Sequence, residues 1–269
     1  MQNLKPKKHL GQHFLADENI ARKIVSTLDA DLQGPVVEIG PGMGVLTKYL
    51  LEQFAEVWVV EFDPDAVQYL QERFAGTGLR VFHADFLKWD FGLLEGRPAR
   101  FIGNLPYNVS SPIFFRLLEN RELVQQGVFM VQKEVSDRIC APAGLSGKEG
   151  GILTVLTDAF FVRKSQFKVP PTVFKPPPKV MSAVFSMNAK PGVATDYQAL
   201  RTVVKAAFGQ RRKTLRNAIK GLEFSGEVPH AWLELRAEAM STANFETLAG
   251  MLVSKSIEFG EEVEEDGVD

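Results

Sequence analysis

Short apolar runs alternate with amphipathic stretches over the first two thirds of the chain. The apolar runs predict five buried strands, at residues 35–40, 56–61, 79–83, 100–103 and 127–132. Between them the apolar positions follow a helical period, as in the inner face that begins after Asp63-Pro64. Strands that alternate with helices indicate βα units, so we expect an α/β fold with a mostly parallel sheet.

Four more segments complete this part of the chain. Asp17 is a fair N-cap for a helix that extends to about Leu28, and Ser110-Ser111-Pro112 is expected to cap another. A third helix is expected over 152–160, after a loop over 141–151. Strands are expected at 161–169 and 180–187, joined by the proline-rich segment 170–178, whose prolines cannot join a ladder.

The C-terminal third has a different pattern. From Asp196 onward there is no strand signal, and three or four short helices fit, at about 196–208, 212–221, 229–238 and 244–256. We expect a domain boundary near Lys190-Pro191-Gly192. The predicted organisation is a sheet domain over 1–190, a small all-helical domain over 191–256 and an acidic, disordered tail over 257–269.

The net charge of −2 conceals a basic body. The last twelve residues contain seven acidic and no basic side chains, so the rest of the chain has 31 basic and 26 acidic side chains. Between Arg201 and Lys220 there are seven Lys or Arg and no Asp or Glu. Such clustering indicates a phosphate-rich partner.

Cys140 is the only cysteine, which excludes a disulfide framework and a Cys-rich zinc site. The four histidines show no metal-ligand spacing, so no metal is expected. The basic N-terminus lacks the apolar core of a signal peptide, and no apolar run approaches membrane-spanning length. We therefore expect a cytoplasmic protein.

A glycine-rich turn, Gly40-Pro41-Gly42-Met43-Gly44, follows the first strand, and Glu61 ends the second. In a parallel sheet this combination indicates a nucleoside-type cofactor whose ribose hydroxyls bind the carboxylate. The dinucleotide fingerprint requires a third small residue where this chain has Val45 or Thr47. A nicotinamide-dependent oxidoreductase is therefore disfavoured.

The run from Glu38 to Gly44 has instead the form E-x-G-x-G-x-G. It resembles the first motif of S-adenosylmethionine-dependent methyltransferases, where the acidic residue lies near the methionine amino end of the cofactor. Asp85, which is expected to end the third strand, is placed to accept from an adenine amino group. The carboxylates and glycines on successive strand ends thus predict one cofactor site.

The fourth strand continues into Asn104-Leu105-Pro106-Tyr107. The Asn side chain offers a carbonyl acceptor, and a residue before proline has an extended backbone whose carbonyl can point outward. Tyr107 offers a flat surface for stacking. Two acceptors beside one ring suit a nucleobase that carries an amino group.

Six motifs carry a family resemblance: Gly-Gln-His-Phe-Leu at 11–15, Val-Glu-Ile-Gly-Pro-Gly at 37–42, Gly-Asn-Leu-Pro-Tyr-Asn at 103–108, Gln-Lys-Glu-Val at 132–135, Phe-Lys-Pro-Pro-Pro-Lys-Val at 174–180 and Phe-Gly-Gln-Arg-Arg-Lys-Thr-Leu-Arg-Asn at 208–217. In this order, over roughly residues 5–255, they resemble the KsgA family, also called RsmA, of ribosomal RNA adenine dimethyltransferases.

The resemblance implies a Rossmann-like fold and two methyl transfers from S-adenosylmethionine to N6 of each of two adjacent adenosines. These lie in a hairpin loop near the 3′ end of 16S ribosomal RNA. The resemblance also implies that the partner is the small (30S) ribosomal subunit, that the protein has a role in the biogenesis of that subunit, and that it is a monomer without a metal.

The resemblance, the strand-end pattern and the clustering of basic residues together assign the site residues. The catalytic set is Asn104, Leu105, Pro106, Tyr107 and Phe174, with Phe174 expected to stack on the target base opposite Tyr107. The cofactor-binding set is His13, Leu15, Glu38, Gly40, Gly42, Glu61, Asp85 and Asn104; His13 stands where the family often has Asn. The RNA-binding set is Lys7, Lys8, Arg211, Arg212, Lys213, Arg216 and Lys220.

A helix over 212–220 would place Arg212, Arg216 and Lys220 on one face, away from Leu215 and Ile219.

Two alternative functions remain at this point. One is a sister enzyme that modifies large-subunit ribosomal RNA, against which the proline-rich segment and the Phe-Gly-Gln-Arg-Arg-Lys segment argue. The other is a non-catalytic RNA-binding assembly factor built on a methyltransferase scaffold.

Overall fold

The computed structural model describes residues 13–142, 144, 150–210 and 212–253. The contacts between residues divide the chain into two compact units. The first comprises 1–140 and 161–190, and the second comprises 141–160 and 191–269. No helix among the described residues has the length and apolar character needed to cross a membrane.

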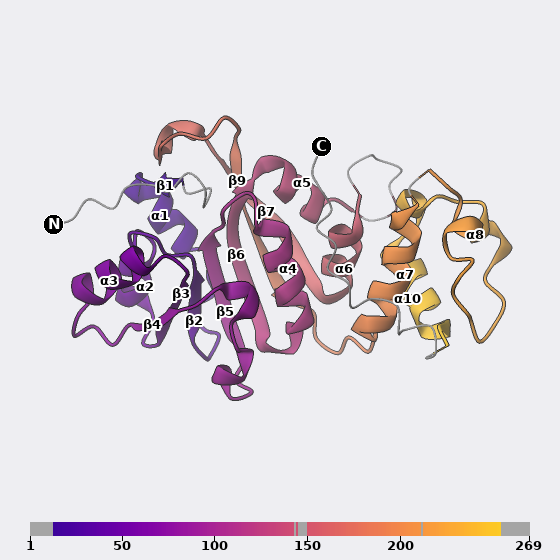
Figure 1. Ribbon diagram of the computed structural model, residues 1–269, viewed down its shortest axis with the longest axis horizontal. Helices are drawn as coiled ribbons and strands as arrows, with labels where there is room; N and C mark the ends of the chain where they lie inside the picture. Colours follow the sequence, from indigo (N-terminus) through magenta and orange to yellow (C-terminus); the bar gives the residue numbers. More distant parts are fainter. Residues whose placement is uncertain (1–12, 143, 145–149, 211, 254–269) are drawn as a thin grey trace. The chain divides into compact units, whose positions relative to one another are not determined.

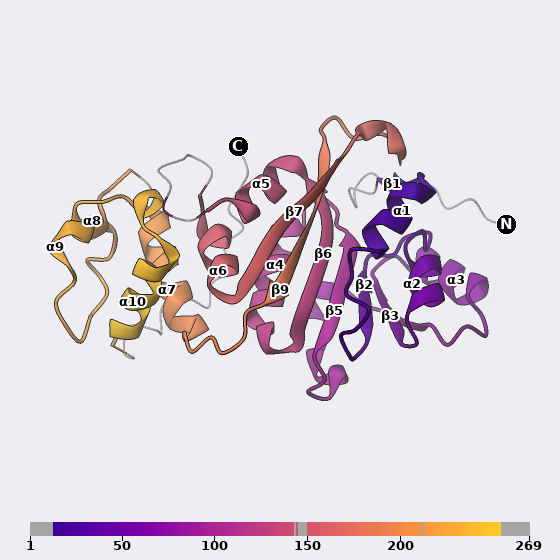
Figure 2. The same cartoon turned by 180° about the vertical axis from the view of Figure 1, so that it is seen from behind.

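A seven-stranded mixed sheet organises the first unit (Figures 1 and 2). Its spatial order is β4-β3-β2-β5-β6-β9-β7. The strands β4, β3, β2, β5 and β6 are mutually parallel, and β9 is antiparallel to both β6 and β7. The strand bounds are β2 (Val36–Ile39), β3 (Val57–Glu61), β4 (Arg80–His83), β5 (Ala99–Asn104), β6 (Val124–Gln132), β7 (Phe161–Val169) and β9 (Ser182–Ala189). The predicted α/β class with a mostly parallel sheet is therefore confirmed.

Both faces of this sheet are covered, which explains the continuous apolar runs. On one face, Val128 and Met130 of β6 pack in a core cluster with Ile24 of α1 (Glu18–Val25). On the other face, the ring of Phe129 meets that of Phe114 of α4 (Ser110–Glu119). Figure 1 shows α4 in front of the sheet, and Figure 2 shows it behind.

Helices of this unit begin where the chain offers a suitable cap. The side chain of Asp17 accepts from the amides of Asn19 and Ile20, and Asp63 caps α3 (Pro64–Arg73) in the same way. The expected cap by Ser110 is wrong, because α4 already includes Ser110 and follows Val109 without a side-chain cap bond. The sequence reasoning also missed α5 (Lys133–Cys140), whose short apolar face has few members, chiefly Val135 and Ile139.

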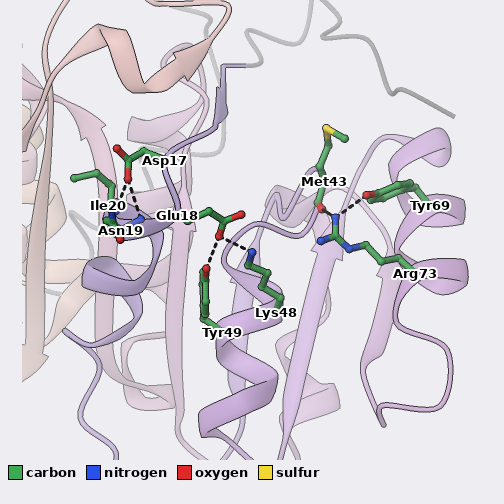
Figure 3. Close-up of polar contacts among 9 residues, drawn as sticks. All are labelled: Asp17, Glu18, Asn19, Ile20, Met43, Lys48, Tyr49, Tyr69 and Arg73. Atoms are coloured by element: carbon green, nitrogen blue, oxygen red, sulfur yellow. Dashed lines mark hydrogen bonds and ion pairs between the residues drawn. The ribbon is translucent and has the colours of Figure 1, made fainter. Parts of the chain in front are cut away.

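Side-chain contacts attach α1 and α3 to the segments around the glycine-rich turn (Figure 3). The carboxylate of Glu18 accepts from the Tyr49 hydroxyl and pairs with Lys48 of α2 (Thr47–Gln53). Arg73 donates to the main-chain carbonyl of Met43 at 3.2 Å and to the Tyr69 hydroxyl at 2.6 Å. These contacts hold the glycine-rich turn against α3, and α1 against α2.

A two-stranded ladder joins the N-terminal segment to the proline-rich segment. Here β1 (Phe14–Leu15) pairs antiparallel with β8 (Phe174–Lys175). As predicted, the prolines of the segment stay outside the ladder, and only Phe174–Lys175, which retain their amides, pair with β1. In both views the segment lies beside β1 (Figures 1 and 2).

The second unit is helical, with α6 (Ile152–Phe160), α7 (Tyr197–Gly209), α8 (Leu215–Ala218), α9 (His230–Leu233) and α10 (Thr242–Met251). Its core includes Leu156, Leu200 and Phe245. The capping box of α10 consists of Ser241 and Asn244.

The expected first domain, 1–190, needs a correction at 141–160. Helix α6 belongs to the second unit, because the ring of Phe160 contacts Tyr197 and the Thr242 hydroxyl donates to Asp158 at 2.5 Å. The chain enters the second unit again after Lys190, at the boundary predicted from Pro191 and Gly192. The predicted acidic tail, 257–269, lies wholly outside the described residues.

Candidate active site

A pocket of about 290 Å³ opens at the carboxyl ends of β2, β3 and β5 and beyond the end of β4. The chain runs from β2 outward to β3 and β4 and then returns to β5 on the other side of β2. Ligands of open α/β sheets bind at such a switch point. The lining includes all the residues of the predicted cofactor set, Glu38, Gly40, Gly42, Glu61, Asp85, Asn104, His13 and Leu15.

The glycine-rich turn brings its backbone up to the pocket. Gly42 has φ +54°, and a Cβ there would lie 2.9 Å from the Phe14 ring. Gly40 has φ +63°, and the space beside it is open to 4 Å. A side chain at either position would strain the turn, and one at Gly42 would also collide with the arm that carries His13.

Glu38 lies at the inner end of the pocket and is 2 % exposed. Its Oε2 accepts from the Thr47 hydroxyl at 2.5 Å. Burial raises the pKa of Glu38 to about 8; the hydrogen bond from Thr47 opposes this and the neighbouring Glu61 adds to it. A bound cation at this end of the pocket would stabilise the ionised form.

Glu61 ends β3 with both carboxylate oxygens engaged by the backbone. Its Oε2 accepts from the Gly42 amide at 3.1 Å and its Oε1 from the Asp63 amide at 2.8 Å. Burial raises the pKa of Glu61, and the amide hydrogen bonds oppose the rise. Each oxygen keeps a further lone pair, so the carboxylate is fixed in place and can still accept from a ligand.

Asp85 lies two residues beyond the end of β4 and caps a short 3-10 helix, Phe86–Lys88. Its Oδ1 accepts from the Leu87 amide at 2.9 Å. The prediction that Asp85 itself ends the strand is therefore off by two residues. Its place on the pocket wall agrees with the predicted one.

Asn104 and Leu105 line the pocket, and each has an acceptor oxygen. The Nδ2 group of Asn104 donates to the main-chain carbonyl of His13 at 2.9 Å, which leaves its Oδ1 as the acceptor. The Leu105 amide donates to Met130 at 3.0 Å. Within the described part of the chain, nothing donates to Asn104 Oδ1 or to the Leu105 carbonyl.

Tyr107 is half-buried beside these acceptors. Its hydroxyl lies 2.7 Å from the hydroxyl of Ser182, at the start of β9. The ring of His13 lies 5.5 Å from the Tyr107 ring at an interplanar angle of 32°, and His13 Nδ1 is 2.8 Å from the Pro176 carbonyl. Burial raises the pKa of the Tyr107 phenol.

The role expected for Phe174 is wrong in this structure. Phe174 is 2 % exposed and packs in the core cluster with Leu15 and Ile24, and it does not line the pocket. The pairing of β8 with β1 turns its side chain inward. It cannot stack on a base opposite Tyr107 from this position.

The sequence reasoning missed three contributors. Thr47 and Ser182 hold Glu38 and Tyr107, and Phe62, which is 59 % exposed, lines the pocket directly after Glu61. A large aromatic residue next to a strand-end carboxylate was a usable signal for Phe62. Ser182 is distant from Tyr107 in sequence and had none.

The predicted RNA-binding residues lie in several places. Lys7, Lys8 and Arg211 fall outside the described residues. Arg212, Lys213 and Lys220 are exposed in the second unit, as is Arg216.

The helix expected over about 212–221 is shorter than predicted, because α8 spans only Leu215–Ala218. Leu215 and Ile219 are nevertheless buried beneath the exposed cations. Arg216 forms an ion pair with Glu234 at 2.7 Å, so part of its charge is already neutralised.

Comparison with known proteins identifies the relatives of this chain. The family model described as "Ribosomal RNA adenine dimethylase" matches residues 3–242. "Ribosomal RNA small subunit methyltransferase A" of Flavobacterium johnsoniae is 42 % identical over 262 residues, 96 % of this chain and 100 % of the relative. The protein of the same name from Parabacteroides distasonis is 47 % identical over 224 residues, 82 % of this chain and 84 % of that relative.

Solved structures show the same fold at low identity. A dimethyladenosine transferase from Plasmodium falciparum superposes with a TM-score of 0.75 at 23 % identity, over 89 % of this chain and 99 % of that one. The 23S rRNA methyltransferase ErmE gives 0.69 at 24 % identity, over 89 % and 99 %. The fold is therefore that of Rossmann-like methyltransferases, and the chain belongs to the ribosomal RNA adenine dimethylase family.

Proposed function

We propose that this protein uses S-adenosylmethionine to dimethylate N6 of two adjacent adenosines in a hairpin loop near the 3′ end of small-subunit (16S) ribosomal RNA. The observation that carries the proposal is the pair of unengaged acceptors, Asn104 Oδ1 and the Leu105 carbonyl, beside Tyr107 in the pocket. Relatives with 42 % and 47 % identity that are named small-subunit methyltransferases support the choice of substrate.

The residues of the pocket fit this methyl donor. Its positive charge suits two buried carboxyls, Glu38 and Glu61, that have no cationic partner among the described residues. We assign Glu61 to the ribose hydroxyls and Asp85 to the adenine amino group, because both carboxylates line the pocket. When bound, S-adenosylmethionine supplies a methyl group already activated by a sulfonium centre, so no strong base is required.

Asn104 and Leu105 orient the target amino group. The lone pair of an adenine amino group is delocalised into the ring, which makes the nitrogen a weak nucleophile. Acceptors on both N–H groups favour the pyramidal nitrogen, whose lone pair is directed at the methyl. The rate gain then comes chiefly from positioning.

Tyr107 provides the stacking surface for a base that has left its own stack. Base–aromatic stacking is worth about 1–3 kcal/mol, which is comparable with the cost of unstacking. Because Phe174 is buried, the second face of the base has to be covered by another group. Pro106 and Asn108 line the pocket on either side of Tyr107.

RNA binding is assigned in part to the exposed cations of the second unit, Arg212, Lys213 and Lys220. Contacts of this kind hold a phosphate backbone without reading sequence, so recognition of the loop depends on its folded shape. The proposed partner is the small (30S) subunit during its biogenesis. A cytoplasmic monomer is the proposed state.

The proposal is tested with radiolabelled methyl donor and unmodified small ribosomal subunits. After incubation the RNA is digested and the labelled nucleoside is identified. Dimethyladenosine in small-subunit RNA is the expected result. Label in large-subunit RNA instead would favour a sister enzyme, and absence of label with retained subunit binding would favour a non-catalytic assembly factor.

A further inference from the structure

The hairpin formed by β7, the proline-rich segment and β9 carries charge of one sign. Residues 161–190 contain six Lys or Arg and no Asp or Glu. Four of these cations, Lys164, Lys168, Lys175 and Lys179, are exposed. Within the part of the chain that the structure describes, none of the four has an ion-pair partner. We call these four residues the hairpin lysines.

Two of the hairpin lysines, Lys164 and Lys168, lie on β7, and the other two lie in the connection to β9. Among the described residues, β7 is the last strand of the sheet and pairs with β9 alone. A register shift between Ser165 and Phe167 places Lys164 opposite Ser186 and Lys168 opposite Ala183. Ser186 and Ala183 are three residues apart on β9, so their side chains point to opposite faces of the sheet. Lys164 and Lys168, which lie opposite them, therefore point to opposite faces as well.

Two of the hairpin lysines lie one residue from contacts that build the target-base site. Lys168 precedes Val169, which pairs with Ser182, whose hydroxyl lies 2.7 Å from that of Tyr107. Lys175 precedes Pro176, whose carbonyl meets His13 at 2.8 Å. The cationic edge is therefore continuous with the site that receives the base.

From these observations we infer that the hairpin lysines bind the phosphate backbone of the RNA strand that enters or leaves the target-base site. This inference rests on the proposed function and adds a second RNA surface, located on the methyltransferase unit itself. A polyanion is the partner that matches unpaired exposed cations in a segment without acids. The lysines hold the strand while Tyr107, Asn104 and Leu105 receive the base.

Lysines on an edge strand have another known use, which is to prevent pairing with a further strand. Protection of the edge strand requires positive charge but no ligand. If this were the role of the lysines, their replacement would not change RNA binding. The two explanations therefore differ in a measurable quantity, the salt dependence of RNA affinity.

The test replaces all four hairpin lysines by Gln. A second variant replaces all four by Arg, which keeps the charge. Binding of a fluorescent RNA hairpin with the 3′-terminal small-subunit loop sequence is measured from about 50 to about 200 mM salt. Each lost phosphate contact should lower the slope of log Kd against log salt by about 0.7–0.9, so four contacts amount to about 3.

A matched pair of variants controls for the loss of positive charge as such. Lys168→Gln with Lys175→Gln is compared with Arg80→Gln and Lys88→Gln, which remove two exposed cations on and just after β4, the opposite edge of the same sheet. The first pair should lower the slope by about 1.5 and the second should leave it unchanged. Thermal unfolding verifies that all variants are folded.

A wild-type slope in the fourfold Gln variant would overturn the inference, as would an equal loss in the Arg80 and Lys88 pair. Loss of slope in the Arg variant as well would also contradict it, because charge would not then be the cause. Methyl transfer by the wild type to small subunits is measured in parallel. If the wild type transfers no label, the proposed function fails; if it does and the slopes are unchanged, only the inference fails.

Discussion

The side-chain amide of Asn104 donates to the main-chain carbonyl of His13 at 2.9 Å, which joins the fourth parallel strand to the N-terminal arm. This bond occupies the donor group of Asn104 and leaves its Oδ1 as the acceptor. A contact through the main chain is independent of the side chain at position 13. It can therefore persist whatever side chain stands at position 13.

Replacement of Asn104 by Ala removes one of the two acceptors for the target amino group. We expect kcat to fall about 100- to 1000-fold, the range typical when one oriented hydrogen-bonding group is lost from an active site. Cofactor affinity should change little, since Glu38, Glu61 and Asp85 are untouched. Isothermal titration and single-turnover methylation measure the two quantities. Wild-type turnover would exclude the role given to Asn104.

The ring of His13 joins Tyr107 to the proline-rich segment, and its two contacts can be separated. Because Nδ1 faces the Pro176 carbonyl, that nitrogen carries the proton. His13→Asn keeps an N–H donor for the Pro176 carbonyl and loses the ring, whereas His13→Phe keeps a ring and loses the donor. His13→Ala loses both.

We expect His13→Ala to lower kcat roughly 10- to 100-fold, as misplacement of Tyr107 would, and the other two variants to fall in between. The measurement is kcat and KM for subunits together with cofactor Kd. A loss confined to cofactor Kd would instead show that the His13 side chain acts on the cofactor.

Phe174 should matter for stability more than for chemistry. Phe174→Ala leaves a cavity in the core and should reduce the free energy of unfolding by about 3–5 kcal/mol, whereas Phe174→Leu should cost about 1 kcal/mol. At a temperature where both variants are folded, Phe174→Leu should transfer methyl groups within about twofold of wild type. If Phe174 stacked on the base, the same variant would lose about 5- to 100-fold in kcat/KM. Urea unfolding and initial rates decide between these outcomes.

Glu38 should make stability depend on pH. Its pKa rises from 4.5 in the unfolded chain to about 8 in the fold, chiefly because of burial. Between these pH values the folded state holds the additional proton, so the free energy of unfolding should fall as pH rises, by at most about 1.4 kcal/mol per pH unit. Above about pH 8 this loss should be complete.

In Glu38→Gln this component should be absent. Urea unfolding of both proteins from pH 5 to above pH 8, without cofactor, is the measurement. Parallel pH profiles for the two proteins would contradict the assignment.

The two arginines of the second unit should contribute unequally to RNA binding. Arg212 is exposed, and Arg216 is paired with Glu234. Arg212→Ala should reduce the salt slope of RNA affinity by about 0.7–0.9, and Arg216→Ala by less. Glu234→Gln releases Arg216 and should strengthen binding. Equal slopes for the two arginine variants would show that the ion pair opens when RNA binds.

The sequence alone determined the parallel sheet, the glycine-rich turn and the order of the site residues along the strand ends. These features are local: a buried strand needs a continuous apolar run, and parallel strands bring their carboxyl ends to one edge. The Asp17 cap and the strands 57–61 and 161–169 follow from neighbouring residues in the same way. The strand-end pocket is therefore predictable from Glu38, Gly40, Glu61 and Asp85 alone.

Only the tertiary structure decided how distant segments meet. Whether Phe174 faces a base or the core depends on the pairing of β8 with β1. In that pairing Phe174 lies opposite Leu15, which is 159 residues away in sequence. The assignment of α6 to the second unit, the ion pair of Arg216 and the bond between Tyr107 and Ser182 also join residues far apart in the chain. Periodicity reports which side of an element is apolar, but it holds no information about which other element covers that side.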